Sequence, residues 1–302
     1  RPFSLATVIV TLALAVVSPF ANATRNILFI AVDDLRVEPQ AITPNLDSLA
    51  AQSTVYTNAY TTALWCLPSR TSVMYGLSPA THQVGLANQA PNYNGPPYTD
   101  IYDNPAVKSL PEILSAAGYT TAVAGKVFHE PEPSKWDVNG PAIEWSTFED
   151  PWNATSDGTY MKNEPLPVGM AHPDQAIADW AEQFIQSSNG PFFLAVGFFQ
   201  PHLPWIAPQW AYDQYASVNV SAAVPVPGDL DDEPLKARAY ADAPIWWGGA
   251  KQYDLVQAAG PGTAEAKTRG YLAAITHTDA MIGQVLAALA NSVHANDTDV
   301  II

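Results

Sequence analysis

The sequence predicts an α/β domain with a mostly parallel central sheet. Continuous apolar runs at residues 26–32 and 192–199 are typical of strands buried on both faces. The recurring order of strand, loop, helix and strand favours a parallel sheet covered by helices. The polar residues best suited to chemistry follow directly after predicted strands, where open α/β sheets bind ligands.

The first half of the chain alternates between strands and helices. Prolines suit the first turn of a helix and glycines the position after its last turn, so both mark helix ends. Ser109 has the side chain of an N-cap. The predicted elements are a strand at 26–32, a helix from Pro44 after the cap Thr43, a strand at 54–60, a helix from Cys66 to the stop at Gly76, a helix at 110–117 and a strand at 119–124.

The second half carries two long insertions, at 131–173 and 204–262. Both are rich in Pro and Trp, and we expect the first to line a cleft. Between and after them we predict a helix at 174–186, a strand at 192–199, a long helix with an apolar stripe from Tyr271 to Leu289 and a strand at 299–302. The insertions' tryptophans either stack on sugar rings or pin loops to the core; they are Trp136, Trp145, Trp152, Trp205, Trp210, Trp246 and Trp247.

Composition argues against several kinds of partner. Apolar residues make up 48% and charged residues 14%, which suits an enzyme with a buried sheet. The formal net charge of −16 argues against nucleic acid and against anionic membrane surfaces. With only 13 Lys and Arg residues, local cations must hold any anionic substrate, so cations inside motifs stand out.

The first 23 residues have the pattern of a secretory signal peptide. A cationic start, an apolar run and an A-x-A site predict cleavage after Ala23, which leaves one catalytic domain over residues 24–302. The alternative, a membrane anchor, requires a longer apolar run. No later segment is predicted to span a membrane, so we expect no stable membrane insertion. We expect the protein in the secretory pathway, and then extracellular, lysosomal, vacuolar or periplasmic. Sequons occur at Asn153, Asn219 and Asn296.

Cys66 is the only cysteine of the chain, so it cannot form an internal disulfide. It opens the pattern Cys66-Leu67-Pro68-Ser69-Arg70, at the N-terminus of a predicted helix. Free N–H groups and the helix dipole favour negative charge there, and Arg70 adds a cation one turn further on. A nucleophile that acts on an anionic ester requires these surroundings. The alternative is a small buried core residue.

Asp33 and Asp34 are adjacent carboxylates at a predicted strand end. Such a pair repels unless a cation or a proton intervenes. A hard divalent cation with oxygen ligands, Ca²⁺ or Mg²⁺, is the natural partner. The alternative is a solvated turn.

Two further segments carry candidate histidines. Lys126 and His129 lie together in G-K-V-F-H, where the ammonium can hold an anionic oxygen and the imidazole can transfer a proton. His202 is held in a stiff Pro-His-Leu-Pro loop. The alternatives are a surface lysine and packing histidines. The predicted structural residues are His82, His172, His277, His294 and the buried hydrogen bonder Asp279.

Together these segments resemble the sulfatases. Asp33-Asp34-Leu35-Arg36, the C-x-P-S-R pattern, G-K-V-F-H, the FFLAVG strand and Pro-His-Leu-Pro occur in that family's order, and they are most similar to its iduronate-2-sulfatase branch. The resemblance covers residues 25–302. At C-x-P-S-R, sulfatases have a cysteine oxidised to formylglycine (3-oxoalanine).

The resemblance implies an alkaline-phosphatase-like α/β sandwich and one divalent cation, usually Ca²⁺. Its ligands here would be Asp33, Asp34 and the oxidised Cys66, which is also the nucleophile. The residues around the sulfate would be Arg70, Lys126, His129 and His202.

The implied chemistry explains why the cysteine must be converted to an aldehyde. Its hydrate carries two hydroxyls on one carbon, and one attacks sulfur while a histidine protonates the departing sugar oxygen. The second hydroxyl collapses back to the aldehyde and expels sulfate, which a thiol cannot do. The expected partners are a sulfated carbohydrate substrate and, during maturation, a formylglycine-generating enzyme.

Two departures from the family pattern leave alternatives open. Gln200 stands where a lysine often precedes the Pro-His pair. The chain also stops before the family's remaining metal ligands, Asp-His or Asp-Asn, so we expect the amino-terminal portion of a longer enzyme, truncated at its C-terminus. The alternatives are a phosphodiester or phosphonate-ester hydrolase of the same superfamily, and a non-catalytic remnant that binds sulfated glycans.

Overall fold

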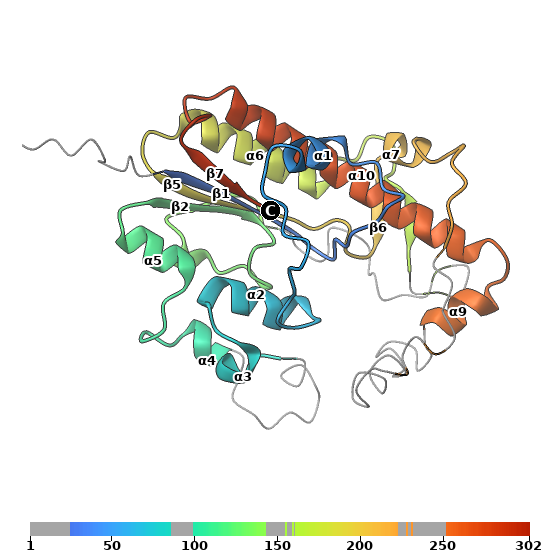
Figure 1. The fold of residues 1–302 in the computed structure, drawn as a ribbon, viewed down its shortest axis with the longest axis horizontal. Coiled ribbons are helices and arrows are strands. Elements are labelled where there is room, and N and C mark those ends of the chain that lie inside the picture. The colour runs from blue at the N-terminus through green and yellow to red at the C-terminus, as the bar shows by residue number, and fades with distance from the viewer. Residues whose placement is uncertain are drawn as a thin grey trace, which may run out of the picture.

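The computed structural model describes residues 25–85, 99–142, 155, 159, 161–222, 228, 231 and 252–302, and a parallel sheet lies at its centre (Figure 1). The strand order is β3-β2-β5-β1-β7, and each neighbouring pair is parallel. This confirms the fold class that the sequence predicts. The strands of this sheet are β1 (Asn26–Val32), β2 (Thr120–Gly125), β3 (Val138–Asn139), β5 (Phe192–Phe198) and β7 (Thr298–Ile301); β4 (Asn163–Pro165) and β6 (Trp205–Ala207) form a second, two-stranded sheet.

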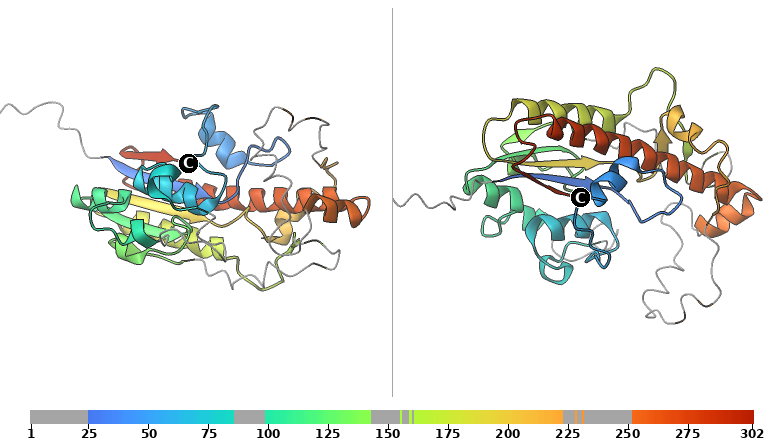
Figure 2. Two further views of the ribbon diagram at one scale, coloured as in Figure 1. Left: turned by 90° about the horizontal axis from the view of Figure 1, so that it is seen from below. Right: turned by 45° about the horizontal axis from the view of Figure 1, so that its top comes forward.

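Helices cover both faces of the central sheet, which gives three layers (Figures 1 and 2). α6 and α10 pack on one face, and α2, α4 and α5 pack on the other. The helices are α1 (Pro44–Ala50), α2 (Cys66–Tyr75), α3 (Pro79–His82), α4 (Thr99–Tyr102), α5 (Leu110–Ala116), the 3-10 turn η2 (Pro133–Lys135), α6 (Pro173–Ser187), α7 (Gln209–Asp213), α9 (Gln252–Ala258) and α10 (Thr263–Ala290).

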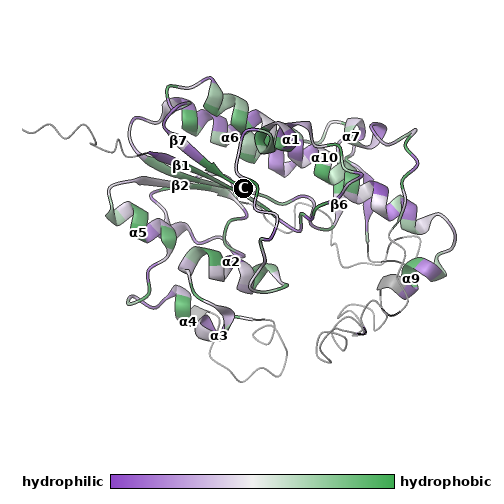
Figure 3. Ribbon diagram, in the orientation of Figure 1, coloured by the Kyte–Doolittle hydropathy of each residue, from purple (hydrophilic) through white to green (hydrophobic). Residues whose placement is uncertain are grey.

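Strand β5 shows why the sheet carries continuous apolar runs. Each of its residues is buried, because helices cover both of its faces. Leu194 and Val196 pack in the cluster with α6 and α10, whereas Phe193 packs in the cluster with α2. In Figure 3 the hydrophobic colour predominates in β1, whereas β7 begins with hydrophilic residues.

Helix α10 corrects the expectation that no later segment has the length and apolar character of a membrane span. Among the described residues, this 28-residue helix alone is long and apolar enough to cross a membrane. However, 72% of its most apolar segment is buried inside the protein. Ile282 and Val285 pack against the sheet in the same cluster as α6. Packing in the core therefore accounts for its composition.

The strand predicted at 54–60 is wrong. The segment is irregular, and Val55, Tyr56 and Tyr60 are 60%, 80% and 87% exposed. Its β-branched and aromatic residues suit a strand, but β5 and β7 already occupy both sides of β1. Tertiary context therefore overrides the local preference.

The two insertions are only partly described. Within the first, Val138 and Asn139 form the edge strand β3, so the segment is not wholly irregular. Trp136 stacks on Phe193 with ring centroids 5.6 Å apart, as expected of a tryptophan that pins a loop to the core. The predictions for the signal peptide and for Asn153, Trp145, Trp152, Trp246 and Trp247 lie outside the described residues.

Asp279 confirms its predicted role as a buried hydrogen bonder. It is 1% exposed, and its carboxylate accepts from the backbone N–H groups of Asn45 at 3.1 Å and Leu46 at 2.8 Å. Thr43 occupies the N-cap position of α1 but makes no capping hydrogen bond with its side chain. Asp279 of α10 thus accepts the hydrogen bonds of the first N–H groups of α1, a task that an N-cap side chain usually performs.

Candidate active site

Polar residues from three neighbouring strands meet at the carboxyl edge of the sheet. Asp33 and Asp34 follow β1, Lys126 follows β2, and His202 lies in the loop after β5. Since β2, β5 and β1 are adjacent and parallel, their carboxyl ends share one edge. The sequence-based expectation that these residues lie at strand ends is confirmed.

Asp33 is held between two cations. Its carboxylate is 3% exposed and accepts from Arg70 Nη2 at 2.8 Å and from Lys126 Nζ. Arg70 also donates to the carbonyl of Val127 at 3.0 Å and to that of Lys126. Burial alone would raise the pKa of Asp33, but Arg70 and Lys126 outweigh it and lower the pKa from 3.8 to about 2. Both cations are therefore held in place by a partner that is ionised at neutral pH.

Two glycines bring Lys126 into this position. Gly125 has a φ of +73°, and a Cβ there would lie 1.9 Å from the carbonyl oxygen of Gly197. A Cβ on Gly197 would lie 2.0 Å from the carbonyl oxygen of Lys126, whose own N–H donates to Gly197 O at 2.9 Å. β2 and β5 thus approach too closely here for any side chain. This close approach explains why a glycine, Gly125, opens the G-K-V-F-H segment.

Asp34 and His202 face each other at a longer distance. His202 Nε2 lies 3.9 Å from Asp34 Oδ2, and the Asp34 side chain is 57% exposed. Desolvation raises the pKa of Asp34, His202 opposes this, and Asp33 adds to the rise. Burial also lowers the pKa of His202, and Lys126 acts in the same direction. Both groups are therefore biased toward their neutral forms.

Cys66 is the first residue of α2 and is partly buried. The helix ends at Gly76 with a φ of 64°, so both predicted helix ends are confirmed. His129 lies within hydrogen-bonding range of the Cys66 side chain, and its Nδ1 is 3.0 Å from Glu130 Oε1. Burial opposes protonation of His129, but these contacts raise its pKa to about 9.

The electrostatics at Asp33 and Asp34 suit a hard divalent cation. The raised pKa of Asp34 reflects desolvation and a neighbouring carboxylate, and a bound cation would offset both effects. Carboxylate oxygens are the ligands that Ca²⁺ and Mg²⁺ prefer. Ca²⁺ takes about six to eight oxygens, so these residues would supply part of its coordination shell.

Asp174 holds the loop that carries His202, a role that the sequence analysis misses. It is fully buried at the start of α6, and its carboxylate accepts from the N–H groups of Phe199 at 2.9 Å and Gln200 at 3.0 Å. Burial raises its pKa to about 6 against the effect of these bonds. The Gln200 side chain is also buried and donates to Pro204 O at 2.7 Å, so it braces the same loop. An aspartate in the first turn of a helix is too common to have indicated this role.

His172 and His277 lie beside Asp174, and the three offer ligand atoms within 4.8 Å of one another. The ring centroids of the two histidines are 4.3 Å apart. Burial lowers the pKa of His172 to about 4 and that of His277 to about 3. His172 Nδ1 accepts from the N–H of Asp174 at 3.1 Å and so caps α6. These contacts suit the structural role predicted for both histidines.

Comparison with known proteins identifies a family for this chain. The chain matches the Sulfatase family model over residues 25–302. It is 30% identical over 308 residues to a sulfatase of Formosa agariphila, covering 92% of this chain and 57% of that protein. It is 28% identical over 317 residues to human iduronate 2-sulfatase, covering 92% and 54% respectively. The chain thus spans about half the length of these relatives.

Solved structures show the same fold. One, of a protein in complex with its substrate D-glucosamine-2-N,6-O-disulfate, has a TM-score of 0.63 at 20% identity and covers 92% of this chain and 64% of its own. A phosphonate monoester hydrolase of Agrobacterium radiobacter has a TM-score of 0.58 at 19% identity, covering 91% and 61%. At these identities the likeness concerns the fold.

The helix-covered parallel sheet, which the two solved structures share, is the α/β architecture of the alkaline-phosphatase-like fold. Within that fold class, the chain belongs to the sulfatase family. This family comprises sulfuric ester hydrolases, which generally use a divalent cation and a formylglycine.

Proposed function

We propose that the protein hydrolyses sulfate esters of carbohydrates, with Cys66 oxidised to formylglycine as its nucleophile. One observation carries the proposal: Cys66 lies at the N-terminus of α2, and the same helix places Arg70 in the buried Arg70–Asp33–Lys126 contact. The names of similar proteins support sulfate as the group that is removed and, for iduronate 2-sulfatase and the disulfated glucosamine complex, a sugar as its carrier.

Each residue has a distinct proposed task. Arg70 and Lys126 stabilise negative charge on the sulfate oxygens, because Asp33 holds both in position before substrate binds. His129, in contact with the Cys66 side chain, is placed to exchange a proton with the departing oxygen. His202, in the neighbouring loop after β5 and 3.9 Å from Asp34, would complete the surroundings of the sulfate.

Asp33, Asp34 and the oxidised Cys66 would hold a divalent cation, Ca²⁺ or alternatively Mg²⁺. When bound, such an ion polarises sulfate oxygens and eases deprotonation of a neighbouring hydroxyl. We also propose a secreted, extracellular or organellar location, supported by the pattern of the first 23 residues.

The test is mass spectrometry combined with turnover. Expressed in a host with the maturation enzyme, the peptide that contains Cys66 should lose the thiol and gain an aldehyde, and the protein should hydrolyse an aryl sulfate. Cys66→Ala should abolish turnover and leave the folded protein intact by circular dichroism. Active protein that carries only unmodified cysteine would contradict the proposed nucleophile.

A second candidate is a phosphonate-ester hydrolase, favoured by the structural likeness to the Agrobacterium radiobacter enzyme. The same cations and nucleophile would serve phosphonate chemistry. Parallel assays on aryl sulfate, aryl phosphate diester and aryl phosphonate separate the two, and we expect the highest kcat/KM on sulfate. Binding of a sulfated glycan without turnover of any ester would indicate a non-catalytic remnant instead.

A further inference from the structure

The turn that follows β1 holds Asp34 in an unusual backbone conformation. Asp34 has a φ of 57°, in the left-handed region that few residues other than glycine adopt. Such a conformation costs free energy and persists where the surrounding structure imposes it. The Asp34 carboxylate contributes little to this, because it is 57% exposed and lies 3.9 Å from His202 Nε2, beyond hydrogen-bonding distance. The turn must therefore be held through its backbone.

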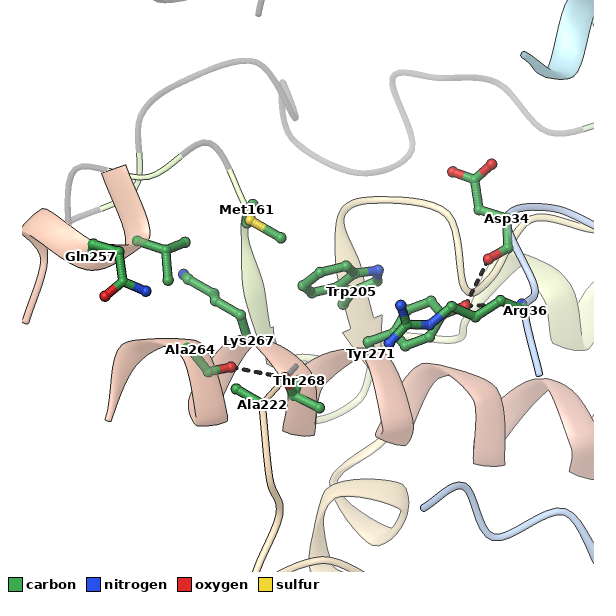
Figure 4. Close-up of a pocket in the computed structure, with 11 residues that line it drawn as sticks. Asp34, Arg36, Met161, Trp205, Ala222, Gln257, Ala264, Lys267, Thr268 and Tyr271 are labelled. Carbon is green, nitrogen blue, oxygen red and sulfur yellow. Dashed lines mark hydrogen bonds between the residues drawn. The ribbon is translucent and has the colours of Figure 1, made fainter. Parts of the chain in front are cut away.

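Tyr271 of α10 holds this backbone through its hydroxyl group. The hydroxyl donates to Asp34 O at 2.8 Å and accepts from the N–H of Arg36 at 3.1 Å (Figure 4). One phenol oxygen thus bridges both sides of the turn, from a helix residue 237 positions further along the chain. Tyr271 is 8% exposed, so water competes little for these two hydrogen bonds.

The ring of Tyr271 is itself fixed by two neighbours. Trp205 packs edge-on against it with ring centroids 5.5 Å apart, and Trp205 Nε1 donates to Pro201 O at 2.8 Å. The Arg36 guanidinium lies over the ring, with its Cζ 5.5 Å from the centroid. The three side chains line a pocket of about 450 Å³ beside Asp34 (Figure 4). A hydroxyl on a ring packed in this way has little freedom to leave the turn.

Tyr271 therefore connects two loops that carry candidate site residues. Its hydroxyl contacts the turn of Asp34, and its ring contacts Trp205, which is bonded to Pro201 in the loop of His202. These loops follow β1 and β5, which are neighbours in the sheet. A residue that contacts both can fix where Asp34 lies relative to the carboxyl edge of the sheet.

We propose that Tyr271 is a positioning residue, whose hydroxyl holds the turn so that the Asp34 carboxylate is in place before a divalent cation binds. The inference rests on the proposed function, because it takes Asp34 as a ligand of that cation. A ligand that is already ordered loses less conformational freedom when the cation binds. Loss of a group that orients a metal ligand typically weakens metal affinity by about tenfold or more.

Tyr271→Phe tests this role, with Tyr215→Phe as the matched control. The Tyr215 hydroxyl also accepts from a buried backbone N–H, that of Ile42 at 2.8 Å, and it also contacts α10, at Thr276. Each variant thus loses one buried hydroxyl and keeps its ring. Both should lower the midpoint of thermal unfolding by a few degrees.

Cation affinity is the first measurement. The full-length natural protein and both variants are titrated calorimetrically with Ca²⁺ alone and with Mg²⁺ alone. Tyr271→Phe should weaken the affinity for the ion that the wild type binds about tenfold, whereas Tyr215→Phe should leave it at the wild-type value. Equal affinities in Tyr271→Phe and the wild type, or equal losses in the two variants, would overturn the proposal. A wild type that binds neither ion would overturn it as well.

Turnover of an aryl sulfate at varied Ca²⁺ concentration is the second measurement. In Tyr271→Phe the Ca²⁺ concentration for half-maximal rate should rise about tenfold, and excess Ca²⁺ should restore most of the maximal rate. A general loss of stability would affect Tyr215→Phe in the same way. If Tyr271→Phe does not fold, Tyr271→His takes its place, because the shorter ring cannot bridge the turn as the phenol does, and the same tenfold loss of affinity is expected.

The two measurements separate failure of this proposal from failure of the proposed function. Weaker Ca²⁺ binding in Tyr271→Phe than in Tyr215→Phe supports the positioning role even if no sulfate ester is hydrolysed. Wild-type turnover together with unchanged Ca²⁺ affinity in Tyr271→Phe refutes the positioning role and leaves the proposed function intact.

Discussion

Two clusters of ionisable side chains lie in this domain, and they use similar residue types in opposite ways. The edge cluster is Asp33 with Arg70 and Lys126, where a buried carboxylate has a pKa of about 2. The inner cluster is Asp174 with His172 and His277, where burial raises the carboxyl pKa to about 6 and lowers those of the histidines. The neighbours of a carboxylate, rather than its burial, decide whether it stays charged.

The difference follows from the partners of each carboxylate. Asp33 meets a guanidinium and an ammonium, whose charges offset the cost of desolvation. Asp174 meets two backbone N–H groups and histidines that burial keeps neutral. The edge cluster is therefore suited to bind an anion, and the inner cluster is suited to hold a loop.

The largest expected effect comes from removing a cation of the edge cluster. Lys126→Ala should lower kcat for a good sulfate ester on the order of a hundredfold or more, because it removes a preorganised stabiliser of transition-state charge. His202→Ala should act in the same direction. Stopped or continuous assays of both variants measure this, with Lys108→Met as the control. If both variants turn over near the wild-type rate, their assignment to the site is wrong.

Disruption of the inner cluster should affect stability before chemistry. Asp174→Ala leaves the buried N–H groups of Phe199 and Gln200 without their acceptor, which should cost about 2 to 4 kcal/mol of unfolding free energy. Urea unfolding measures the change. Asp179→Asn, an exposed change on the same helix, should shift stability by about 0.5 kcal/mol or less. Equal effects of the two changes would contradict the bracing role of Asp174.

The effect that is smallest near neutral pH is a change in acid sensitivity. His172 and His277 titrate below their usual 6.5, so the unfolded chain binds more protons and stability falls as the pH drops from about 6.5 toward about 4 and 3. Asp174, whose pKa is raised from 3.8 to about 6, opposes part of this loss between those two values. Each uncompensated proton corresponds to about 1.4 kcal/mol per pH unit.

The variant His277→Phe removes one of these titrating groups, so it measures the contribution of His277 to the pH dependence of stability. Urea midpoints between pH 7 and pH 5 should depend less steeply on pH in His277→Phe than in the wild type. An unchanged slope in His277→Phe would mean that His277 has the same pKa in the folded protein as in the unfolded chain, which would contradict its lowered pKa.

The sequence by itself determined the local features of this protein. The apolar runs of β1 and β5 are long enough to require cover on both faces, and Pro68 and Gly76 delimit the helix that Cys66 begins. The order of acidic pair, cysteine motif, G-K-V-F-H and Pro-His-Leu-Pro indicated the family. These signals are readable because each depends on residues close together in the chain.

Only the tertiary structure decided which of these residues meet. Lys126 reaches Asp33 across 93 positions, and Asp279 caps α1 across 234, because the order of strands and the packing of α10 bring them together. The same long-range packing excludes a strand at 54–60 and places Asp174 under the His202 loop. It also makes Trp205 and Lys267 part of one pocket with Asp34. Such contacts leave no local periodicity in the chain, since each depends on where a distant element packs.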